Sequence, residues 1–210
     1  MDHFEVFGLP RRLAIDAAAL QRQFYELSRR YHPDFHQGAS TEDQARVLEA
    51  STRVNAAYRA LRDPLARIDY LVWLEEGRET REGATVKPQA PPELLAEMFE
   101  IQEALEEAKA GGLDASGRAR LAEERERLLS RLHEEEQRLR GPLSEAWDAA
   151  SDAAERAGAL AHFKEALATR AYLRTVVDDL AEAVGDRPQA SADRAEPAGE
   201  GQTHVAYHRD

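Results

Sequence analysis

The chain contains no cysteine among its 210 residues. Disulfides, thiolate zinc sites, directly ligated iron–sulfur clusters and thiol catalysis are therefore all excluded. Aromatic residues are also scarce, at 7%, whereas charged residues make up 32% of the chain. Alanine, leucine, glutamate and arginine are abundant, which favours helices that have one buried stripe and a charged outer face. The composition therefore predicts an all-α protein.

Positive charge is in short supply as well. The 28 lysines and arginines are outnumbered by 40 aspartates and glutamates, so the formal net charge is -12. Because nucleic-acid binding needs a basic footprint, we expect no nucleic-acid partner. The opening MDHFE is acidic and lacks the apolar run of a secretory signal, and no window of the sequence is apolar enough to span a bilayer. A soluble cytoplasmic protein without a membrane partner is expected.

Two stretches with helical periodicity flank the tripeptide His32-Pro33-Asp34. The first follows Asp16, a residue type that caps helices, and the second covers residues 41–62. Proline disfavours helical geometry in the residue before it, so the first helix should end at residue 31 or 32. The two helices should pack antiparallel and display the tripeptide at the tip of a hairpin. A further short helix is expected at residues 65–74.

The second half of the chain begins after a stretch of different composition. Residues 76–92 are rich in glycine, proline and charge, and we interpret them as a linker. Three helical regions follow, at about 93–110, 114–140 and 143–184, and they predict a three-helix bundle. Gly141-Pro142 is expected to separate the last two regions, and Gly158 is a candidate for a kink. Residues 185–210 have the composition of a disordered tail.

The tripeptide and its surroundings resemble a J domain, the DnaJ-type module that activates the ATPase of DnaK-class chaperones. The resemblance rests on the basic helix, the tripeptide, the loop after it and the run NAAYRALRDP at residues 55–64, and it covers about residues 1–75. The opening MDHFEVFGLP and the runs DPLARIDYL and LLAEMFEIQEALEE are similar to one J-protein family, HscB. Phe35 stands where general J domains commonly carry a basic residue.

The resemblance implies a specific architecture and role. The expected fold is a J domain at 1–75, made of an antiparallel helical hairpin with flanking helices, followed by the linker 76–92, a C-terminal three-helix bundle at 93–184 and the tail 185–210. HscB proteins bring the iron–sulfur scaffold protein IscU to the chaperone HscA. An HscA/DnaK-class ATPase and an IscU-like scaffold are therefore the expected partners. The resemblance implies no catalytic residue, no metal and no cofactor in this chain itself.

The expected contact with the chaperone ATPase lies at the hairpin tip. Pro33 fixes one backbone torsion, so His32 and Asp34 would lose little entropy on binding. Basic side chains of the preceding helix could add charge-assisted contacts. The residues that the resemblance assigns to this contact are His32, Pro33, Asp34, Arg22, Arg29 and Arg30. For the arginines, and for Arg22 and Arg29 above all, a solvated helix face is the alternative interpretation.

The expected contact with the scaffold protein lies on the first helix of the bundle. At about 100° per residue, Leu94, Met98, Ile101 and Leu105 form a core stripe, and a second face carries apolar residues beside carboxylates. An apolar patch with a charged rim is typical of interaction sites. The residues that the resemblance assigns to scaffold binding are Leu95, Phe99, Glu100, Glu103, Glu107 and Tyr172. Alternatively, Leu95 and Phe99 are buried against the next helix and the glutamates are solvated. Ala96 stands where a larger apolar residue is more typical.

Other functions compete with this interpretation. The nearest is a J protein that serves a different client. A helical enzyme with His32 and Asp34 as an acid–base pair would need a cleft and further polar groups around them. His32 and His36 could suggest a metal site, but no third or fourth ligand accompanies them in the sequence. A purely structural helical scaffold would tolerate substitutions at both expected contacts.

Overall fold

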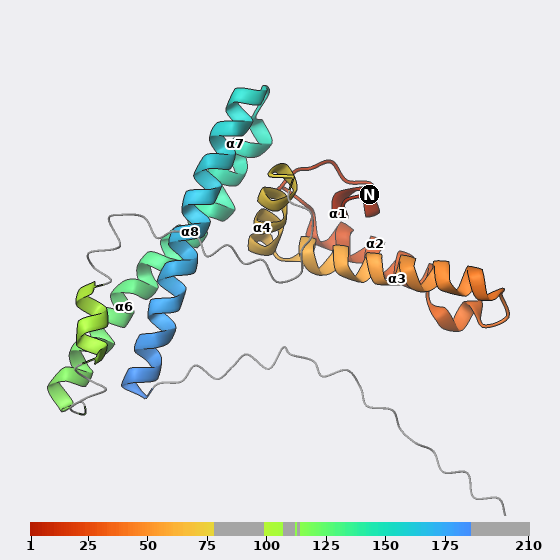
Figure 1. Cartoon of the computed structure of the whole chain (residues 1–210). Coiled ribbons are helices and arrows are strands. Elements are labelled where there is room, and N and C mark those ends of the chain that lie inside the picture. The colour runs from red at the N-terminus through yellow and green to blue at the C-terminus, as the bar shows by residue number, and fades with distance from the viewer. Residues whose placement is uncertain (78–98, 107–111, 113, 186–210) are drawn as a thin grey trace, which may run out of the picture.

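The computed structural model describes residues 1–77, 99–106, 112 and 114–185, and all regular structure within them is helical (Figure 1). The N-terminal half contains α1 (His3–Val6), α2 (Ala17–Arg30), the 3₁₀ helix η1 (Pro33–His36), α3 (Thr41–Arg62) and α4 (Pro64–Glu75). A helical segment at 99–106 follows, and then α6 (Ala115–Arg138), the π-helical turn η2 (Leu139–Leu143), α7 (Ser144–Ala149) and α8 (Ala153–Val184). The predicted all-α class is confirmed.

Side chains of short polar residues begin the main helices. Asp16 accepts hydrogen bonds from the N–H groups of Ala18 and Ala19, at 2.9 and 3.0 Å. Ser40, Asp63, Asp114 and Asp152 cap α3, α4, α6 and α8 in the same manner. Each cap satisfies a backbone donor that has no partner inside its helix. The caps of α2, α3 and α6 were predicted from the sequence, whereas Asp152 and the start of α8 were not.

The α2–α3 hairpin projects away from the rest of the molecule (Figure 1). Apolar residues line its inner face: Leu20 of α2 and Val54 of α3 are buried, and the ring of Phe24 stacks on that of Tyr58 at a centroid distance of 4.0 Å. α2 ends at Arg30, with Tyr31 as its C-cap, as the following proline predicts. η1 begins at Pro33 within the tripeptide and includes Phe35 and His36, the first two residues of the expected loop.

One hydrophobic core joins the N-terminal half to the near end of the helices α6–α8. Phe4, Leu61 and Leu71 are fully buried in the same cluster as Leu139 and Phe163. Polar contacts lie beside it. The Asp148 carboxylate of α7 accepts hydrogen bonds from the N–H groups of Leu13 and Ala14, at 2.8 and 2.7 Å. The Trp147 indole N–H donates to the Arg11 carbonyl at 3.2 Å. The loop before α2 is thus fastened to α7.

A buried arginine lies at this junction. Arg67 is only 4% exposed and donates from Nε to the Leu61 carbonyl at 2.8 Å and from Nη1 to the Leu13 carbonyl. Burial lowers the pKa of its guanidinium, and the carboxylates of Asp63 and Asp148 oppose this effect. Without Arg67, the carbonyls of Leu61 and Leu13 would lose this hydrogen-bond donor, and an unsatisfied buried acceptor lowers the stability of the fold.

The second half departs from the sequence expectation at its helix boundaries. Gly141-Pro142 does not separate two helices, because the chain continues through them as η2 and then as α7. A proline inside a helix removes a donor and crowds the preceding turn, and the wider π turn relieves that crowding. The Ser144 hydroxyl donates to the Leu139 carbonyl at 2.6 Å. The chain reverses only at residues 150–152, and α8 runs through Gly158 without interruption.

A second hydrophobic core lies at the far end of α6 and α8. Segment 99–106 contributes Ile101 and Leu105, which pack with Leu128 of α6 and with Leu173 and Leu180 of α8. These contacts confirm the predicted core stripe at Ile101 and Leu105, while Leu94 and Met98 lie outside the described residues. The linker and tail predictions also fall outside them. None of the described helices has the length and apolar character that crossing a membrane requires.

Candidate partner-binding sites

The tripeptide forms a stiff turn at the hairpin tip. Pro33 opens η1, and His32 Nδ1 accepts a hydrogen bond from the Asp34 N–H at 3.3 Å. The His36 ring Nε2 lies 2.9 Å from the Arg30 carbonyl, which ties the turn to the end of α2. Because Nδ1 of His32 is an acceptor in this arrangement, the neutral ring carries its proton on Nε2, which remains available to a partner.

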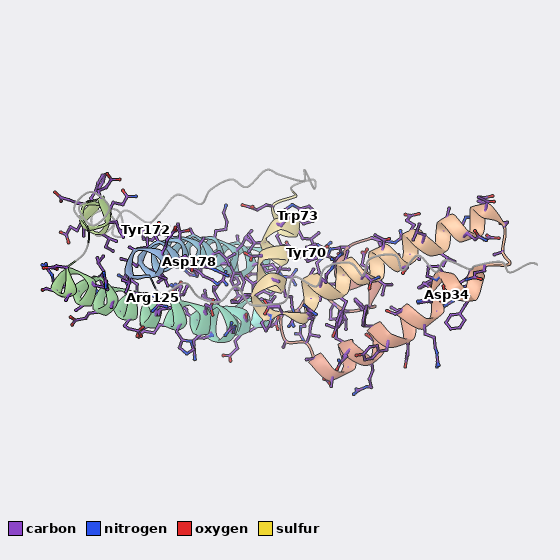
Figure 2. The ribbon with its side chains drawn as sticks, turned by 90° about the horizontal axis from the view of Figure 1, so that it is seen from below. Asp34, Tyr70, Trp73, Arg125, Tyr172 and Asp178 are labelled. Carbon is purple, nitrogen blue, oxygen red and sulfur yellow. The ribbon has the colours of Figure 1, made fainter. Side chains whose placement is uncertain are left out.

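The tip is open to solvent. The side chains of His32 and Asp34 are 52% and 72% exposed, with 3.6 Å between Nδ1 and Oδ2. The neighbouring Phe35 ring is 69% exposed and makes an edge contact with the His32 ring. Figure 2 shows Asp34 at the end of the hairpin farthest from α6 and α8. Both side chains therefore lie on an open surface that is accessible to a macromolecular partner.

The three predicted arginines lie on α2 and are exposed. Arg29 and Arg30 occupy its last turn, where the negative end of the helix dipole favours cations. The Arg30 guanidinium lies 5.6 Å from the centroid of the Tyr31 ring. Within the described part of the chain, none of Arg22, Arg29 and Arg30 forms an ion pair. The hairpin therefore offers cationic side chains beside the tripeptide.

A groove at the opposite end of the molecule separates segment 99–106 from the C-terminal end of α8. Its lining residues are Phe99, Gln102, Glu103, Leu105, Glu106, Asp179, Glu182 and Ala183. The Phe99 ring is 71% exposed, so the alternative that it is buried against the next helix is wrong. An exposed aromatic ring beside carboxylates is typical of a protein-interaction surface.

The predicted scaffold-contact residues are brought together only in part. Phe99 and Glu103 line the groove, whereas Glu100 is exposed next to it without belonging to the lining. Tyr172 lies on α8, half-buried against the second core (Figure 2). Leu95 and Glu107 lie outside the described residues. Tyr172 was the predicted contribution of the last helix, whereas Asp179 and Glu182, which line the groove, were missed, because the periodicity of one helix does not reveal which residues of another helix lie opposite.

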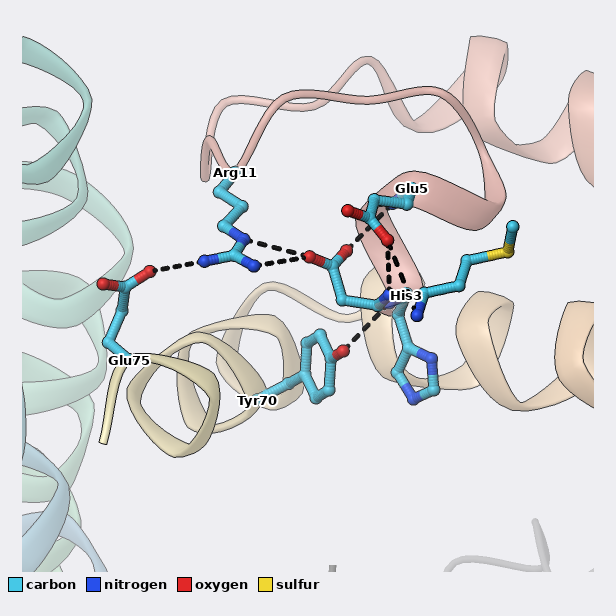
Figure 3. Close-up of polar contacts among 7 residues, drawn as sticks. His3, Glu5, Arg11, Tyr70 and Glu75 are labelled. Carbon is cyan, nitrogen blue, oxygen red and sulfur yellow. Dashed lines mark hydrogen bonds and ion pairs between the residues drawn. The ribbon is translucent and has the colours of Figure 1, made fainter. Parts of the chain in front are cut away.

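A third polar cluster, at the N-terminus, was also missed (Figure 3). Asp2 caps α1 and accepts from the Arg11 side chain at 2.9 Å, and Arg11 also contacts Glu75 of α4 at 3.3 Å. The His3 N–H donates to the Tyr70 hydroxyl at 2.9 Å, and the two rings stack at 4.3 Å. Burial raises the pKa of Tyr70, although the His3 N–H acts in the opposite direction. These contacts fix α1 onto α4 and account for the cluster structurally.

Two family models match this chain, and solved structures of HscB proteins resemble it. A family model described as DnaJ domain matches residues 2–70, and one described as HSCB C-terminal oligomerisation domain matches residues 90–168. The chaperone HscB from Vibrio cholerae shares 28% identity over 86% of this chain and 99% of its own, with a TM-score of 0.51. The human co-chaperone protein HscB shares 25% identity over 86% of this chain and 80% of its own, with a TM-score of 0.57.

Proposed function

Because the chain belongs to the HscB-type family of J-domain co-chaperones, we propose that it delivers an IscU-like iron–sulfur scaffold protein to an HscA/DnaK-class chaperone and stimulates the ATPase of that chaperone. The observation that carries the proposal is the placement of two dissimilar surfaces at opposite ends of one molecule. The exposed tripeptide occupies the hairpin tip, and the apolar, acidic groove lies between segment 99–106 and the C-terminal end of α8.

At the hairpin tip the protein acts by binding rather than by catalysis. The His32 ring and the Asp34 carboxylate are held by the short η1 turn, so little conformational entropy remains to be lost when they contact the ATPase. Arg22, Arg29 and Arg30 supply charge-assisted hydrogen bonds to acidic groups of the partner. Binding shifts the chaperone toward its hydrolysis-competent conformation, to the extent that this conformation binds the tip more tightly.

At the other end, the groove holds the scaffold protein. Phe99 supplies apolar area that is exposed in the free protein and becomes buried on binding. Glu103 fixes the orientation of the partner through hydrogen bonds or ion pairs at the rim of that apolar contact. Glu100 and Tyr172 remain part of the proposed surface, as do Leu95 and Glu107 outside the described residues.

The steady-state ATPase rate of the cognate chaperone tests the hairpin end. We expect the wild-type protein to raise the rate and His32→Gln to abolish the increase, because the amide cannot reproduce the imidazole contacts. His162→Gln, at an exposed position of α8, is the matched control and should stimulate like the wild type. Equal stimulation by His32→Gln would refute the role of the tripeptide.

Titration of the purified scaffold protein tests the groove end. Loss of a central exposed aromatic ring commonly costs about 1–2 kcal/mol in binding, so Phe99→Ala should weaken the complex by roughly tenfold. Leu48→Ala removes an exposed apolar side chain of α3 and should leave the affinity unchanged. If the wild type stimulates the ATPase but binds no scaffold protein, the client is a different protein.

A further inference from the structure

The groove between segment 99–106 and α8 has two walls. One wall comes from segment 99–106, where the residues at helical spacing are Phe99, Gln102, Glu103 and Glu106. Asp179 and Glu182, with Ala183, recur at helical spacing on α8 and form the other. Leu105, buried in the second core, lies at the base. A segment seated in the groove would therefore touch α8 as well as the helix that carries Phe99.

Both walls are acidic. Glu103 and Glu106 on one side and Asp179 and Glu182 on the other are exposed, and none of the four forms an ion pair with a described residue. Glu182 lies in the last turn of α8, where the helix dipole adds further negative potential. Among the described residues that line the groove there is no lysine, arginine or histidine.

The glutamates of α6 are arranged differently. Glu124 pairs with Arg127 at 2.5 Å, Glu135 with Arg138 at 3.1 Å, and Glu136 with both Arg140 and Arg170. These three glutamates are thus balanced by arginines three or four positions on, or by one on α8. The negative potential of the groove, by contrast, is not offset by a neighbouring cation of the described chain, and it is concentrated around an exposed phenyl ring.

We propose that this groove binds a basic, apolar segment of the client, and that Asp179 and Glu182 of α8 are interface residues. Ammonium or guanidinium groups of the segment lie between the two acidic walls, and an apolar side chain packs on Phe99. Electrostatic complementarity of this kind selects the partner and accelerates association. The client's identity as the scaffold protein rests on the proposed function, whereas the charge of the segment rests on the groove itself.

The chain's own C-terminal residues are a poorer occupant on grounds of charge. Residues 186–210 contain five aspartates and glutamates and only three arginines. A segment with that balance is repelled by four carboxylates rather than attracted. The complementary partner is therefore a separate, basic chain.

The test uses the full chain and three proteins. Asp179→Asn/Glu182→Gln removes the charge of the α8 wall with little change in shape. Asp178→Asn is the matched control, because Asp178 is the adjacent exposed carboxylate of the same helix but does not line the groove (Figure 2). Thermal unfolding should be alike for all three, since these side chains are exposed. The scaffold protein is then titrated at low and at high ionic strength.

We expect the double variant to bind the scaffold protein about tenfold more weakly at low salt, with a shallower loss of affinity as salt rises, because screening acts on the removed charges. Asp178→Asn should match the wild type in both respects. A double variant with wild-type affinity and salt dependence overturns the inference and leaves the proposed function intact.

A second probe separates the inference from the client's identity. Two synthetic helical peptides are titrated against the wild type and the double variant. One consists of leucine and lysine, and the other has glutamate at every position where the first has lysine. The leucine–lysine peptide should bind the wild-type protein, bind the double variant more weakly, and outcompete its acidic counterpart. If the scaffold protein does not bind the wild type, the proposed function fails, and this peptide result alone decides the inference. Equal binding of the basic peptide to wild type and double variant, or no binding, overturns it.

Discussion

Asp148 is the residue through which α7 holds the loop that precedes α2. Its carboxylate accepts two backbone hydrogen bonds, from Leu13 and Ala14, and its charge also acts on the buried guanidinium of Arg67. Arg67 in turn donates to the Leu13 carbonyl. Both the donor and the acceptor of Leu13 are thus satisfied by charged side chains, one from α7 and one from α4. Charge-assisted bonds of this kind are stronger than those between neutral groups.

The first prediction concerns Asp148→Ala. The substitution leaves the N–H groups of Leu13 and Ala14 without their acceptor, and we expect the free energy of unfolding to fall by about 2–4 kcal/mol. Urea denaturation measures the change. Glu145→Ala, at an exposed position of the same helix, is the control and should shift the free energy by less than about 0.5 kcal/mol. Similar losses in the two variants would show that the Asp148 contacts contribute little.

The second prediction concerns pH and His3, which stacks on Tyr70. Burial lowers the pKa of His3 below its usual 6.5, and the Asp2 carboxylate opposes this effect. On acidification the unfolded chain therefore takes up a proton before the folded chain does. The stabilising effect is fully present above pH 6.5 and decreases as the pH falls from there toward the folded pKa.

Denaturation of the wild type and His3→Phe at several pH values between 7.5 and 5 measures this effect. The phenyl ring can keep the stacking but cannot titrate, so the wild type should lose more stability than the variant. Asp2 does not interfere in this range: burial alone would raise the pKa of its carboxyl, but hydrogen bonds from the Glu5 N–H and the Arg11 guanidinium lower it. Parallel stability curves for the two proteins would contradict the prediction.

At the scale of the helix, local signals predicted α2, α3 and α4 well. Asp16 and Ser40 are caps, and the prolines at 33 and 64 mark helix boundaries, because each acts on backbone groups within a few residues. Gly141-Pro142 carried the same kind of signal and gave the wrong boundary. The chain continues there as a π turn, η2, in which Leu139 and Leu143 are buried in the shared core. Tertiary packing, rather than the local glycine–proline signal, therefore determines where the helix ends.

The third prediction follows from Gly158, which lies inside α8 rather than at a kink. A Cβ added there meets no atom within 4 Å, and its φ is not in the left-handed region. Gly158→Ala should therefore stabilise the protein by about 0.5–1 kcal/mol, because alanine restricts the unfolded chain and favours the helix. Thermal unfolding would show a higher Tm. A lower Tm would mean that the helix needs the flexibility of glycine at this point.

The groove illustrates a second limit of sequence reasoning. Periodicity separated the buried Ile101 and Leu105 from the exposed Phe99 on the same helix, and the structure confirms this division. It did not reveal that Asp179 and Glu182 lie opposite. Their place depends on how α8 packs against segment 99–106, and the charge pattern of α8 alone does not encode that packing. Contacts within one element were predictable, and contacts between elements distant in the chain were not.

At the scale of the molecule, the core of the N-terminal half is continuous with buried residues of η2, α7 and α8. Leu61, Ile68 and Leu71 belong to the cluster that also contains Trp147 and Phe163. Separation of the two halves would expose this shared surface to water. The burial of apolar area across the junction therefore contributes to the stability of both halves.

The fourth prediction tests this dependence with residues 1–77 produced alone. Without the α7 and α8 side chains, α4 should lose protection from hydrogen exchange, and the fragment should unfold at a lower urea concentration than the full chain. The full chain should unfold in one transition when followed by tryptophan fluorescence and by circular dichroism. Equal midpoints for the fragment and the full chain would show that the junction adds no stability.

The length of α8 sets the spacing between the shared core and the groove. Its 32 residues span about 48 Å, and the part between Phe163 of the shared core and Asp179 of the groove spans about 24 Å. A continuous helix acts as a rigid spacer. It sets both the distance of the groove from the shared core and the direction in which the groove faces around the helix axis. Seven residues added to both α6 and α8 would move the groove about 10 Å outward and turn it by only about 20°. Five added residues would turn it by roughly 140°, so that the groove would face a different direction relative to the hairpin tip.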